Sequence, residues 1–527
     1  MRDFHRPGRS EVLGTGGMVA TSHPIAAQAG VRMLLAGGNA ADAAIAMATT
    51  LHVCEPHMCG LGGDCFVLVK RPGTEEVRAL NGSGRAPARA SAEALRAEGL
   101  EAIPLDHPAA VTVPGAVDAL CRLAEEEGKL GLEAVLAPAI AHAEDGVPVA
   151  PRVAADWVGS AERLQGAARK FYLVDGQAPG LGTVFRAPGQ AEVLRRIARQ
   201  GRAGFYEGEV AEDLVASLRA LGGVHTAEDF AATACSWGEP ITSDYRGAQL
   251  LEHPPNGQGA TAALILNILS QFDLASMDPH GPERVHLLAE ATKLGYDARD
   301  RFIGDADRTT GLDHMLSMDT AAQLAALIDP DKAIEAPVAR ATAAVHRDTV
   351  LMTAVDRDGM AVTLIHSIFH SFGSGLASDR FGLLFQNRGA GFTLAQGHPN
   401  ELAPRMRPMH TIIPAMLREG GRVTLAFGVM GGQYQATGHS HVLGNLRDHG
   451  MGLQEALDAP RSFAIDGKLE MEAGFDGAVL AALKAKGHDA VRRPEPLGGA
   501  QAIAIDHARG VLIGASDPRK DGCAIGL

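Results

Sequence analysis

The chain has 527 residues, of which 46% are hydrophobic and 21% charged, and its net charge is −14. This composition is typical of a soluble globular protein that is long enough to bury a full core. The negative charge argues against nucleic acid or an anionic membrane as a partner, because both require clustered Lys and Arg, and the sequence has no such run.

The first ten residues carry positive charge with no apolar segment behind them, so we predict no secretory signal. The sequence has no uninterrupted run of about 18 apolar residues, so we predict no membrane span. Six cysteines are few for this length and favour reduced thiols and a cytoplasmic protein. The sequence predicts neither a metal site nor a cofactor, because the one cluster of candidate ligands matches no common zinc spacing: Cys54, His57, Cys59 and Cys65.

Helices dominate the expected structure before residue 349. One helix begins at Ser22-His23-Pro24 and stops at Gly37-Gly38, and Asn39 caps a second helix made of small residues. Residues 116–223 alternate helical runs with Gly and Pro breaks, which predicts a helical layer. A charged helix covers residues 290–305, where ion pairs that support the scaffold are the default explanation of the charges.

Strands dominate the rest of the chain. Residues 306–345 have loose periodicity and are expected to form a mobile or surface segment. A β-hairpin then runs from Thr349 to Leu364, with its turn at Asp356-Arg357-Asp358-Gly359. Further strands are expected at 410–417 and 423–428, and a final hairpin at 501–515 with its turn at Arg509-Gly510. Helices are expected from about Tyr434 and from Leu453 to Asp458.

This order of elements favours an α+β fold in which stacked sheets are covered by helices. The sequence contains no internal repeat and no low-complexity linker. One interwoven body is therefore favoured over separable domains.

The dipeptide Asp348-Thr349 at the start of the hairpin carries a chemical hypothesis. A threonine hydroxyl is a weak nucleophile, and nothing next to it in a continuous chain would activate it. Cleavage before Thr349 would give this residue a free α-amine, whose ordinary pKa of about 7.7–8.0 leaves part of it as the free base at neutral pH. That amine could accept the proton of its own hydroxyl. Most Asp-Thr pairs, however, only begin strands or turns.

The stretch from Asp348 to Val362, followed by Ser371-Phe372-Gly373-Ser374-Gly375, resembles the start of the small subunit in the γ-glutamyltransferase family. The resemblance runs nearly end to end, as far as Gly514–Arg519. Members of this family are N-terminal-nucleophile hydrolases that cleave themselves before this threonine. The resemblance implies a four-layer αββα sandwich built from both fragments, with residues 1–348 as the large subunit and residues 349–527 as the small one.

The oxyanion that develops when threonine attacks an amide carbonyl requires hydrogen-bond donors. Gly431-Gly432, at the end of a predicted strand, can present two backbone N–H groups, although a plain turn is the simpler interpretation of these residues alone. By resemblance, this pair forms the oxyanion hole of the family. Ser367 lies where the family has a threonine close to the nucleophile, so we expect its hydroxyl to hydrogen-bond Thr349.

The residues that recognise the γ-glutamyl group in the family are replaced in this chain. The arginine that holds the α-carboxylate is Ser83 here, with Arg85 two residues on, and a nearby asparagine is Phe369. The aspartate that takes the α-amine is Gly391, and a Ser-Ser pair is His410-Thr411. Without that aspartate, an ammonium group would be buried unpaired. An acidic substrate without an amine is therefore expected, and its candidate binding residues are Arg85, Arg388, His410 and Thr411.

The sequence thus predicts a self-processing N-terminal-threonine amidohydrolase or acyltransferase. It would cut its own chain between Asp348 and Thr349 and then cleave an amide of a small acid, γ-glutamyl or oxamate-like. The pattern is closer to a divergent branch that includes oxamate amidohydrolase and glutathione hydrolase-like proteins. A glutaryl-type acylase and a non-cleaving protein that binds a small acid are the alternatives. The acyl acceptor and any homo-oligomer are left open.

Overall fold

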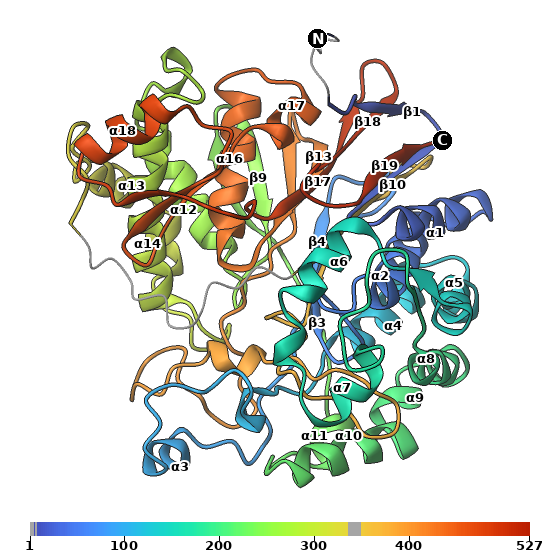
Figure 1. Ribbon diagram of the computed structural model, residues 1–527. Coiled ribbons are helices and arrows are strands. Elements are labelled where there is room, and N and C mark those ends of the chain that lie inside the picture. The colour runs from blue at the N-terminus through green and yellow to red at the C-terminus, as the bar shows by residue number, and fades with distance from the viewer. Residues whose placement is uncertain (1–4, 6–7, 336–348) are drawn as a thin grey trace.

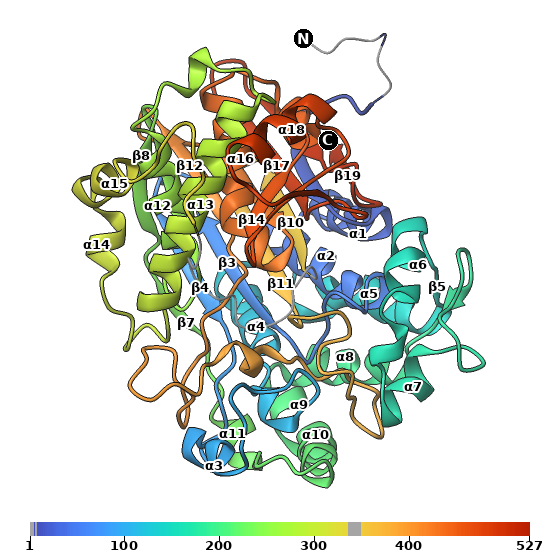
Figure 2. The ribbon, with the colours of Figure 1, turned by 60° about the vertical axis from the view of Figure 1, so that its left-hand side comes forward.

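The computed structural model describes residues 5, 8–335 and 349–527. Two seven-stranded sheets lie face to face at its centre, and helices cover the outer side of each sheet, as Figures 1 and 2 show. The core between the sheets takes side chains from both: Met18 and Leu68 belong to one sheet, and Met416 and Ile503 to the other. The predicted α+β sandwich with four layers, αββα, is confirmed.

One sheet carries the hairpin that follows Thr349. All residues of its two strands are buried, because helices cover one face and the second sheet covers the other. The predicted turn is confirmed: Asp356 Oδ1 accepts hydrogen bonds from the N–H groups of Asp358 (2.9 Å) and Met360 (3.0 Å). In spatial order the strands are β19 (Cys523–Gly526), β2 (Gly17–Thr21), β10 (Val350–Asp356), β11 (Ala361–Ser367), β3 (Asp64–Lys70), β4 (Val77–Gly82) and β7 (Ser236–Gly238).

The second sheet holds most of the strands predicted after residue 410. The strand expected to begin at His410 begins at Ala415 instead. Pro414 has no N–H group that could donate a hydrogen bond to a neighbouring strand. The N–H of His410 donates instead to the carbonyl of Asn256 at 2.7 Å. In spatial order the strands are β1 (Val12–Gly14), β18 (Val511–Ser516), β17 (Gly499–Asp506), β13 (Arg422–Met430), β12 (Ala415–Glu419), β9 (Ala248–Glu252) and β8 (Ile241–Tyr245).

The helices outside the first sheet come from the N-terminal part of the chain. Asn39 forms the predicted cap, since its Oδ1 accepts hydrogen bonds from the N–H groups of Ala41 and Asp42 at 3.1 Å. The helix that it caps is buried along its whole length. The helices of this layer are α1 (Pro24–Leu35), α2 (Ala40–Cys54), α4 (Ala116–Glu127), α5 (Gly131–Asp145), α8 (Pro188–Gln200), α9 (Ala203–Tyr206), α10 (Gly208–Ala220) and α11 (Ala227–Ala231).

The helices outside the second sheet come from both sides of Thr349. Two of them, α14 (Leu312–Leu316) and α15 (Met318–Ala325), lie in the segment for which only a mobile or surface stretch was expected, and they bury Met315 and Ala321. The others are α12 (Gly259–Leu269), α13 (Pro282–Phe302), α16 (Gln435–Arg447) and α17 (Leu453–Asp458).

Smaller elements complete the fold. A three-stranded sheet and α18 pack on α13 through a separate apolar core that includes Val285 and Leu483. These and the remaining elements are β14 (Ser462–Ile465), β15 (Lys468–Met471), β16 (Ala490–Arg492), α18 (Gly477–Ala485), α3 (Ala92–Ala97), α6 (Pro151–Val158), α7 (Gly166–Tyr172), β5 (Val147–Pro148) and β6 (Val184–Phe185).

Both sheets contain strands from before and from after Thr349. The hairpin β10–β11 lies between β2 and β3, and β12 pairs with β9. The apolar core between the first sheet and its covering helices therefore contains both Val67 of β3 and Met352 of β10. Strands from both sides of Thr349 therefore contribute side chains to the same apolar core.

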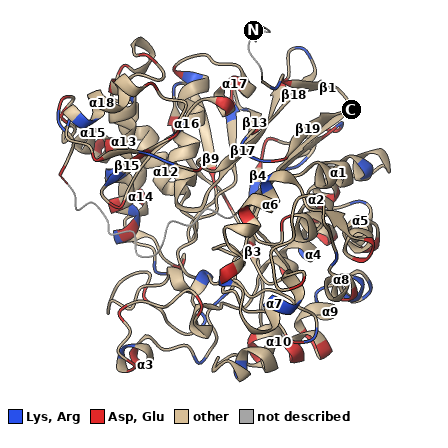
Figure 3. Ribbon diagram, viewed as in Figure 1, with Lys and Arg blue, Asp and Glu red and all other residues tan. Residues whose placement is uncertain are grey.

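Charged residues lie mainly on the outer helices, where both signs are interspersed (Figure 3). Arg196 of α8, for example, pairs with Glu192 and Glu209 at 2.8 Å. Of the helices in the described part of the chain, none combines the length and the apolarity that crossing a membrane requires.

Candidate active site

Thr349 lies at the end of the central hairpin and is fully buried. The ladder between β10 and β11 pairs Val350 with His366, so one further step places Thr349 opposite Ser367. The structure thus brings together the expected nucleophile and the hydroxyl that was predicted beside it. Asp348, the residue before the predicted cut, lies outside the described residues.

The hydroxyl of Thr349 is contacted by a side chain that the sequence did not single out. The Nε2 amide of Gln435 donates a hydrogen bond to Thr349 Oγ1 at 3.3 Å. Its Oε1 accepts the N–H of Ile413 at 2.9 Å, which fixes the orientation of the amide. Gln435 is the first residue of α16, and only its position shortly after Gly431-Gly432 could have indicated it.

The predicted oxyanion residues form the turn between β13 and α16. Gly431 has φ 120° and Gly432 has φ 57°, both in the region that L side chains rarely adopt. A Cβ on Gly431 would also lie 2.9 Å from the Cα of Gly498. The turn therefore requires glycine, and Gln435 anchors its far end at the hydroxyl of Thr349.

Arg388 is the central cation of the site and is fully buried. Its Nη2 donates to Ser367 Oγ at 3.2 Å and its Nη1 to Thr411 Oγ1 at 3.0 Å. The guanidinium also lies 4.2 Å from the ring centroid of Phe369. Burial lowers the pKa of Arg388 to about 9, against the opposing effect of Asp64, so the side chain remains a cation at neutral pH.

The counter-charge of Arg388 is Asp64, the first residue of β3, which the sequence analysis missed. Its Oδ1 accepts the N–H groups of Gly84 (2.8 Å) and Gly115 (3.1 Å) and the amide of Gln386 (2.9 Å). Burial alone would raise the pKa of Asp64, but its hydrogen bonds and the nearby cation outweigh burial and lower it. The only sequence signal was a charged residue directly after Gly62-Gly63, at the start of an apolar strand.

His410 supports Asp64. Its Nε2–H donates to Asp64 Oδ2 at 3.3 Å, and its Nδ1 accepts the N–H of Ile412 at 3.3 Å. Burial, helped by the charge of Arg388, lowers the pKa of His410 to about 3, so the ring is neutral. Both ring nitrogens of His410 are therefore engaged, one with Asp64 and one with the backbone.

Arg85 lies apart from this group. Its side chain is 41% exposed, and its Nη1 contacts Asp305 Oδ2 at 3.3 Å and the carbonyl of Arg405 at 2.9 Å. Of the four predicted substrate-binding residues, Arg388 hydrogen-bonds both Ser367 and Thr411, and His410 hydrogen-bonds Asp64. Arg85 pairs instead with the buried Asp305.

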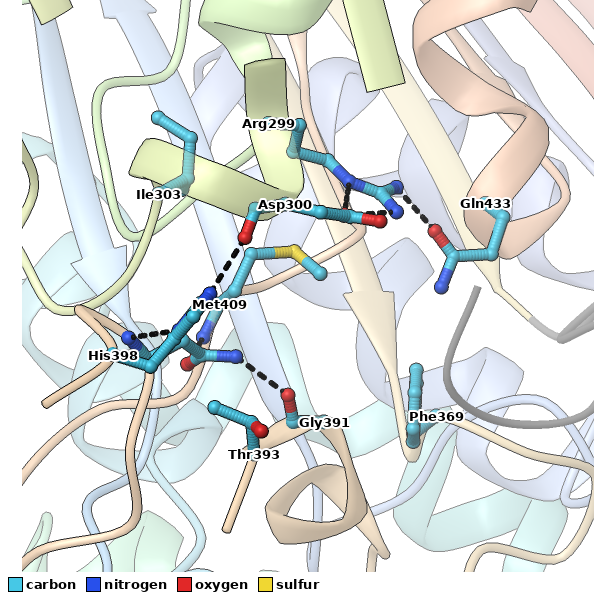
Figure 4. Close-up of a pocket in the computed structure, with 10 residues that line it drawn as sticks. Arg299, Asp300, Ile303, Phe369, Gly391, Thr393, His398, Met409 and Gln433 are labelled. Carbon is cyan, nitrogen blue, oxygen red and sulfur yellow. Dashed lines mark hydrogen bonds and ion pairs between the residues drawn. The ribbon is translucent and has the colours of Figure 1, made fainter. Parts of the chain in front are cut away.

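A pocket of about 150 Å³ opens beside this group. Figure 4 shows Arg299, Asp300 and Gln433 on one side of it and Gly391, Thr393 and Phe369 on the other. Phe369 connects the pocket to the site, because its ring also packs on Arg388. Gly391 contributes no side chain, so this position offers no carboxylate to the pocket. Ile303, His398, Asn400 and Met409 complete the lining.

Comparisons with known proteins agree with this geometry. The model of the gamma-glutamyltranspeptidase family matches residues 26–527. The chain is 37% identical over 534 residues to the glutathione hydrolase-like YwrD proenzyme of Bacillus subtilis, which covers 98% of this chain and 99% of that protein. It is 34% identical over 535 residues to the oxamate amidohydrolase proenzyme of Klebsiella pneumoniae, with the same coverage.

Among solved structures, the cephalosporin acylase from Bacillus halodurans superposes with a TM-score of 0.93 at 37% identity, covering 100% of this chain and 99% of that one. Likeness of this extent reaches every layer of the fold, including the strand that begins after Thr349. It supports an amide hydrolase or acyltransferase that is made as a precursor. The chain therefore belongs to the γ-glutamyltranspeptidase family and is an enzyme of the N-terminal-nucleophile hydrolase type.

Proposed function

We propose that the chain cuts itself between Asp348 and Thr349 and that Thr349 then hydrolyses the amide of a small acid that lacks an α-ammonium group. The large fragment would be residues 1–348 and the small one residues 349–527. The observation that carries the proposal is the buried guanidinium of Arg388, which contacts Ser367, the residue opposite Thr349.

The chemistry follows from Thr349 as a chain end. Its Oγ attacks the amide carbonyl while its own α-amine takes the hydroxyl proton. The N–H groups of Gly431 and Gly432 stabilise the oxyanion of the tetrahedral intermediate. The protonated amine then gives its proton to the leaving nitrogen, which breaks the C–N bond and leaves an ester on Thr349. Water, or an amine in a transferase reaction, releases the acyl group by the reverse sequence of proton transfers.

The choice of an acid without an amine rests on the charges around the pocket. Arg388 supplies a buried cation, and its Nε has no hydrogen-bond partner among the described residues. A carboxylate placed there would gain charge-assisted hydrogen bonds. Asp64 cannot readily receive an ammonium group, because its oxygens already accept four hydrogen bonds. Asp300 is likewise paired, with Arg299 at 2.6 Å.

Glutaryl-type amides are the second candidate within this class. A pocket of about 150 Å³ with apolar walls at Ile303 and Met409 has more room than an oxamate-sized acid needs. The likeness to a protein named cephalosporin acylase supports an acyl amide as the substrate. Oxamate-like amides remain the smaller alternative, and γ-glutamyl amides carry the ammonium group that this site does not match.

Two measurements test the proposal. A denaturing gel with N-terminal sequencing should give two fragments, one of which begins at Thr349, and a single intact band for Thr349→Ala. Hydrolysis of glutaryl, oxamate and γ-glutamyl amides by the processed protein should then favour the two substrates without an ammonium group. An uncut wild-type chain would instead support a non-cleaving binding protein. A preference for the γ-glutamyl amide would refute the substrate class while leaving the nucleophile intact.

A further inference from the structure

A buried group of three metal-binding side chains lies outside the site of Thr349. His286 and Glu290 are four residues apart and therefore share one face of α13, and His488 follows α18. One ligand atom from each of the three lies within 4.8 Å of the other two. Arg299, which lines the pocket, is 13 positions further along α13 than His286, or about 20 Å along the helix axis. We propose that His286, Glu290 and His488 bind one divalent metal ion, with zinc the best match.

The spacing of the ligand atoms fits a tetrahedral ion. His286 Nδ1 lies 2.8 Å from His488 Nε2, and His488 Nε2 lies 3.7 Å from Glu290 Oε1. Two ligands at usual zinc distances in a tetrahedral arrangement are about 3.3 Å apart, between these two values. Two histidines and one carboxylate are a common zinc ligand set that leaves the fourth position open.

The surroundings already orient two of the ligands. The other ring nitrogen of His286, Nε2, donates to the carbonyl of Asp329 at 2.8 Å, so its Nδ1 presents a lone pair towards His488. The other oxygen of Glu290, Oε2, accepts the N–H of Ile334 at 2.8 Å. A backbone partner on the far side of each ligand is the arrangement that fixes metal ligands in proteins. To bind the ion, His488 moves its proton from Nε2 to Nδ1.

One side chain competes with the ion. Lys293 Nζ donates to Glu290 Oε1 at 2.6 Å and to the carbonyl of Ile334 at 3.2 Å. The ion must take this carboxylate oxygen from the ammonium group, which can keep its bond to Ile334. Removing the ammonium should therefore strengthen metal binding, whereas in a plain ion-pair network it would only remove a bond.

The position of the group gives the ion a structural role. His286 and Glu290 precede Thr349 and His488 follows it, so, resting on the proposed cleavage, the ion would join the two fragments. His286 and Glu290 also hydrogen-bond the backbone of Asp329 and Ile334, which belong to the large fragment. Metal binding itself does not require cleavage and should also occur in the uncut Thr349→Ala chain.

The test uses full-length protein freed of metal by a chelator and titrated calorimetrically with zinc chloride. Wild type and Thr349→Ala should each bind one zinc ion per chain. His488→Gln should weaken binding by more than the ~10–100-fold that loss of an outer-sphere partner costs. Lys293→Gln should tighten binding by about tenfold, within the range of an outer-sphere change. His449→Gln, a histidine outside the group, is the matched control and should bind as wild type does.

Cobalt chloride gives a second readout, because Co²⁺ in a four-coordinate N/O site absorbs visible light far more strongly than the hydrated ion. The expected spectrum appears in wild type and is lost in His488→Gln. Circular dichroism and thermal unfolding of the metal-free variants show whether they fold. Three results would each overturn the proposal: no stoichiometric zinc in wild type, unchanged affinity in folded His488→Gln, or equal or weaker binding in Lys293→Gln.

Discussion

Arg388 and Arg85 were equally plausible carboxylate ligands in the sequence, and the structure separates them. Arg388 is buried and contacts Ser367 and Thr411, whereas Arg85 is part of a half-exposed ion pair with Asp305. A forked guanidinium cannot be replaced by a point charge at a site where two of its nitrogens donate in fixed directions.

We therefore expect Arg388→Lys to lower kcat/KM for an acidic amide by about 10–100-fold, the equivalent of losing charged hydrogen bonds worth ~1.5–3 kcal/mol. Arg85→Lys is the matched control and should stay within about twofold, because Arg85 contacts Asp305 and Arg405 rather than Ser367 or Thr411, and lysine keeps the charge beside Asp305. Steady-state kinetics on purified, fully processed protein measure both. Equal losses of kcat/KM in the two variants would contradict the assignment of the substrate carboxylate to Arg388.

The protonation of Arg388 also predicts a pH dependence. Its pKa is lowered to about 9, so the charge that attracts the substrate is present at neutral pH and is lost as the pH rises through about 9. The α-amine of Thr349 must be unprotonated to act as a base, so activity should rise through its ordinary pKa of about 7.7–8.0. A bell-shaped profile of kcat/KM between these limits is expected. In Arg388→Lys the alkaline limb should move, while the acid limb should not.

Gly391 offers a test of the missing ammonium site. It does not adopt a positive φ, and an added Cβ would be in ordinary contact with the carbonyl of Met409 at 3.4 Å. Gly391→Asp should raise the ratio of γ-glutamyl to glutaryl hydrolysis by about tenfold, because it supplies a counter-charge for the ammonium worth ~1–2 kcal/mol. The uncharged Gly391→Asn controls for size. An equal shift in both variants would show that shape rather than charge sets the preference.

Among the secondary-structure elements, the turn from β13 to α16 is the one on which the chemistry depends. Gly431 has φ 120°, and a Cβ there would meet the Cα of Gly498 at 2.9 Å. Gly431→Ala should lower the free energy of unfolding by about 1–3 kcal/mol and reduce kcat, because the backbone N–H groups would turn away from the oxyanion. Gly477→Ala, where the added Cβ meets nothing within 4 Å, is the control. Thermal unfolding and single-turnover rates give the two readouts.

Elements defined by local signals were predicted well from the sequence. The hairpin β10–β11, its turn at Asp356–Gly359 and helix α17 fall where they were expected, because apolar runs and turn residues determine them. The start of β12 was placed five residues early, since tertiary contacts use the N–H of His410 elsewhere. The short helices α14 and α15 were missed because their apolar periodicity is weak, and such short helices are stabilised mainly by packing on α12.

The candidate site was predicted in part for the same reason. Thr349 and Ser367 are adjacent through the ladder of one hairpin, which the sequence makes visible. Asp64 and Gln435 reach the site from distant strands and helices, and no local pattern identifies them. Asp64 is the first residue of β3, and it lies opposite Ser367 only because β3 pairs with β11.

Across the full chain, the mixing of strands from either side of Thr349 within each sheet has a consequence for refolding after cleavage. An uncut chain folds as one molecule, because β2, β10, β11 and β3 are all on the same polypeptide. Once the chain is cut, a denatured copy must find its other half in solution, so recovery becomes a second-order reaction whose rate falls on dilution. Cleavage would therefore create the catalytic residue and at the same time make unfolding hard to reverse.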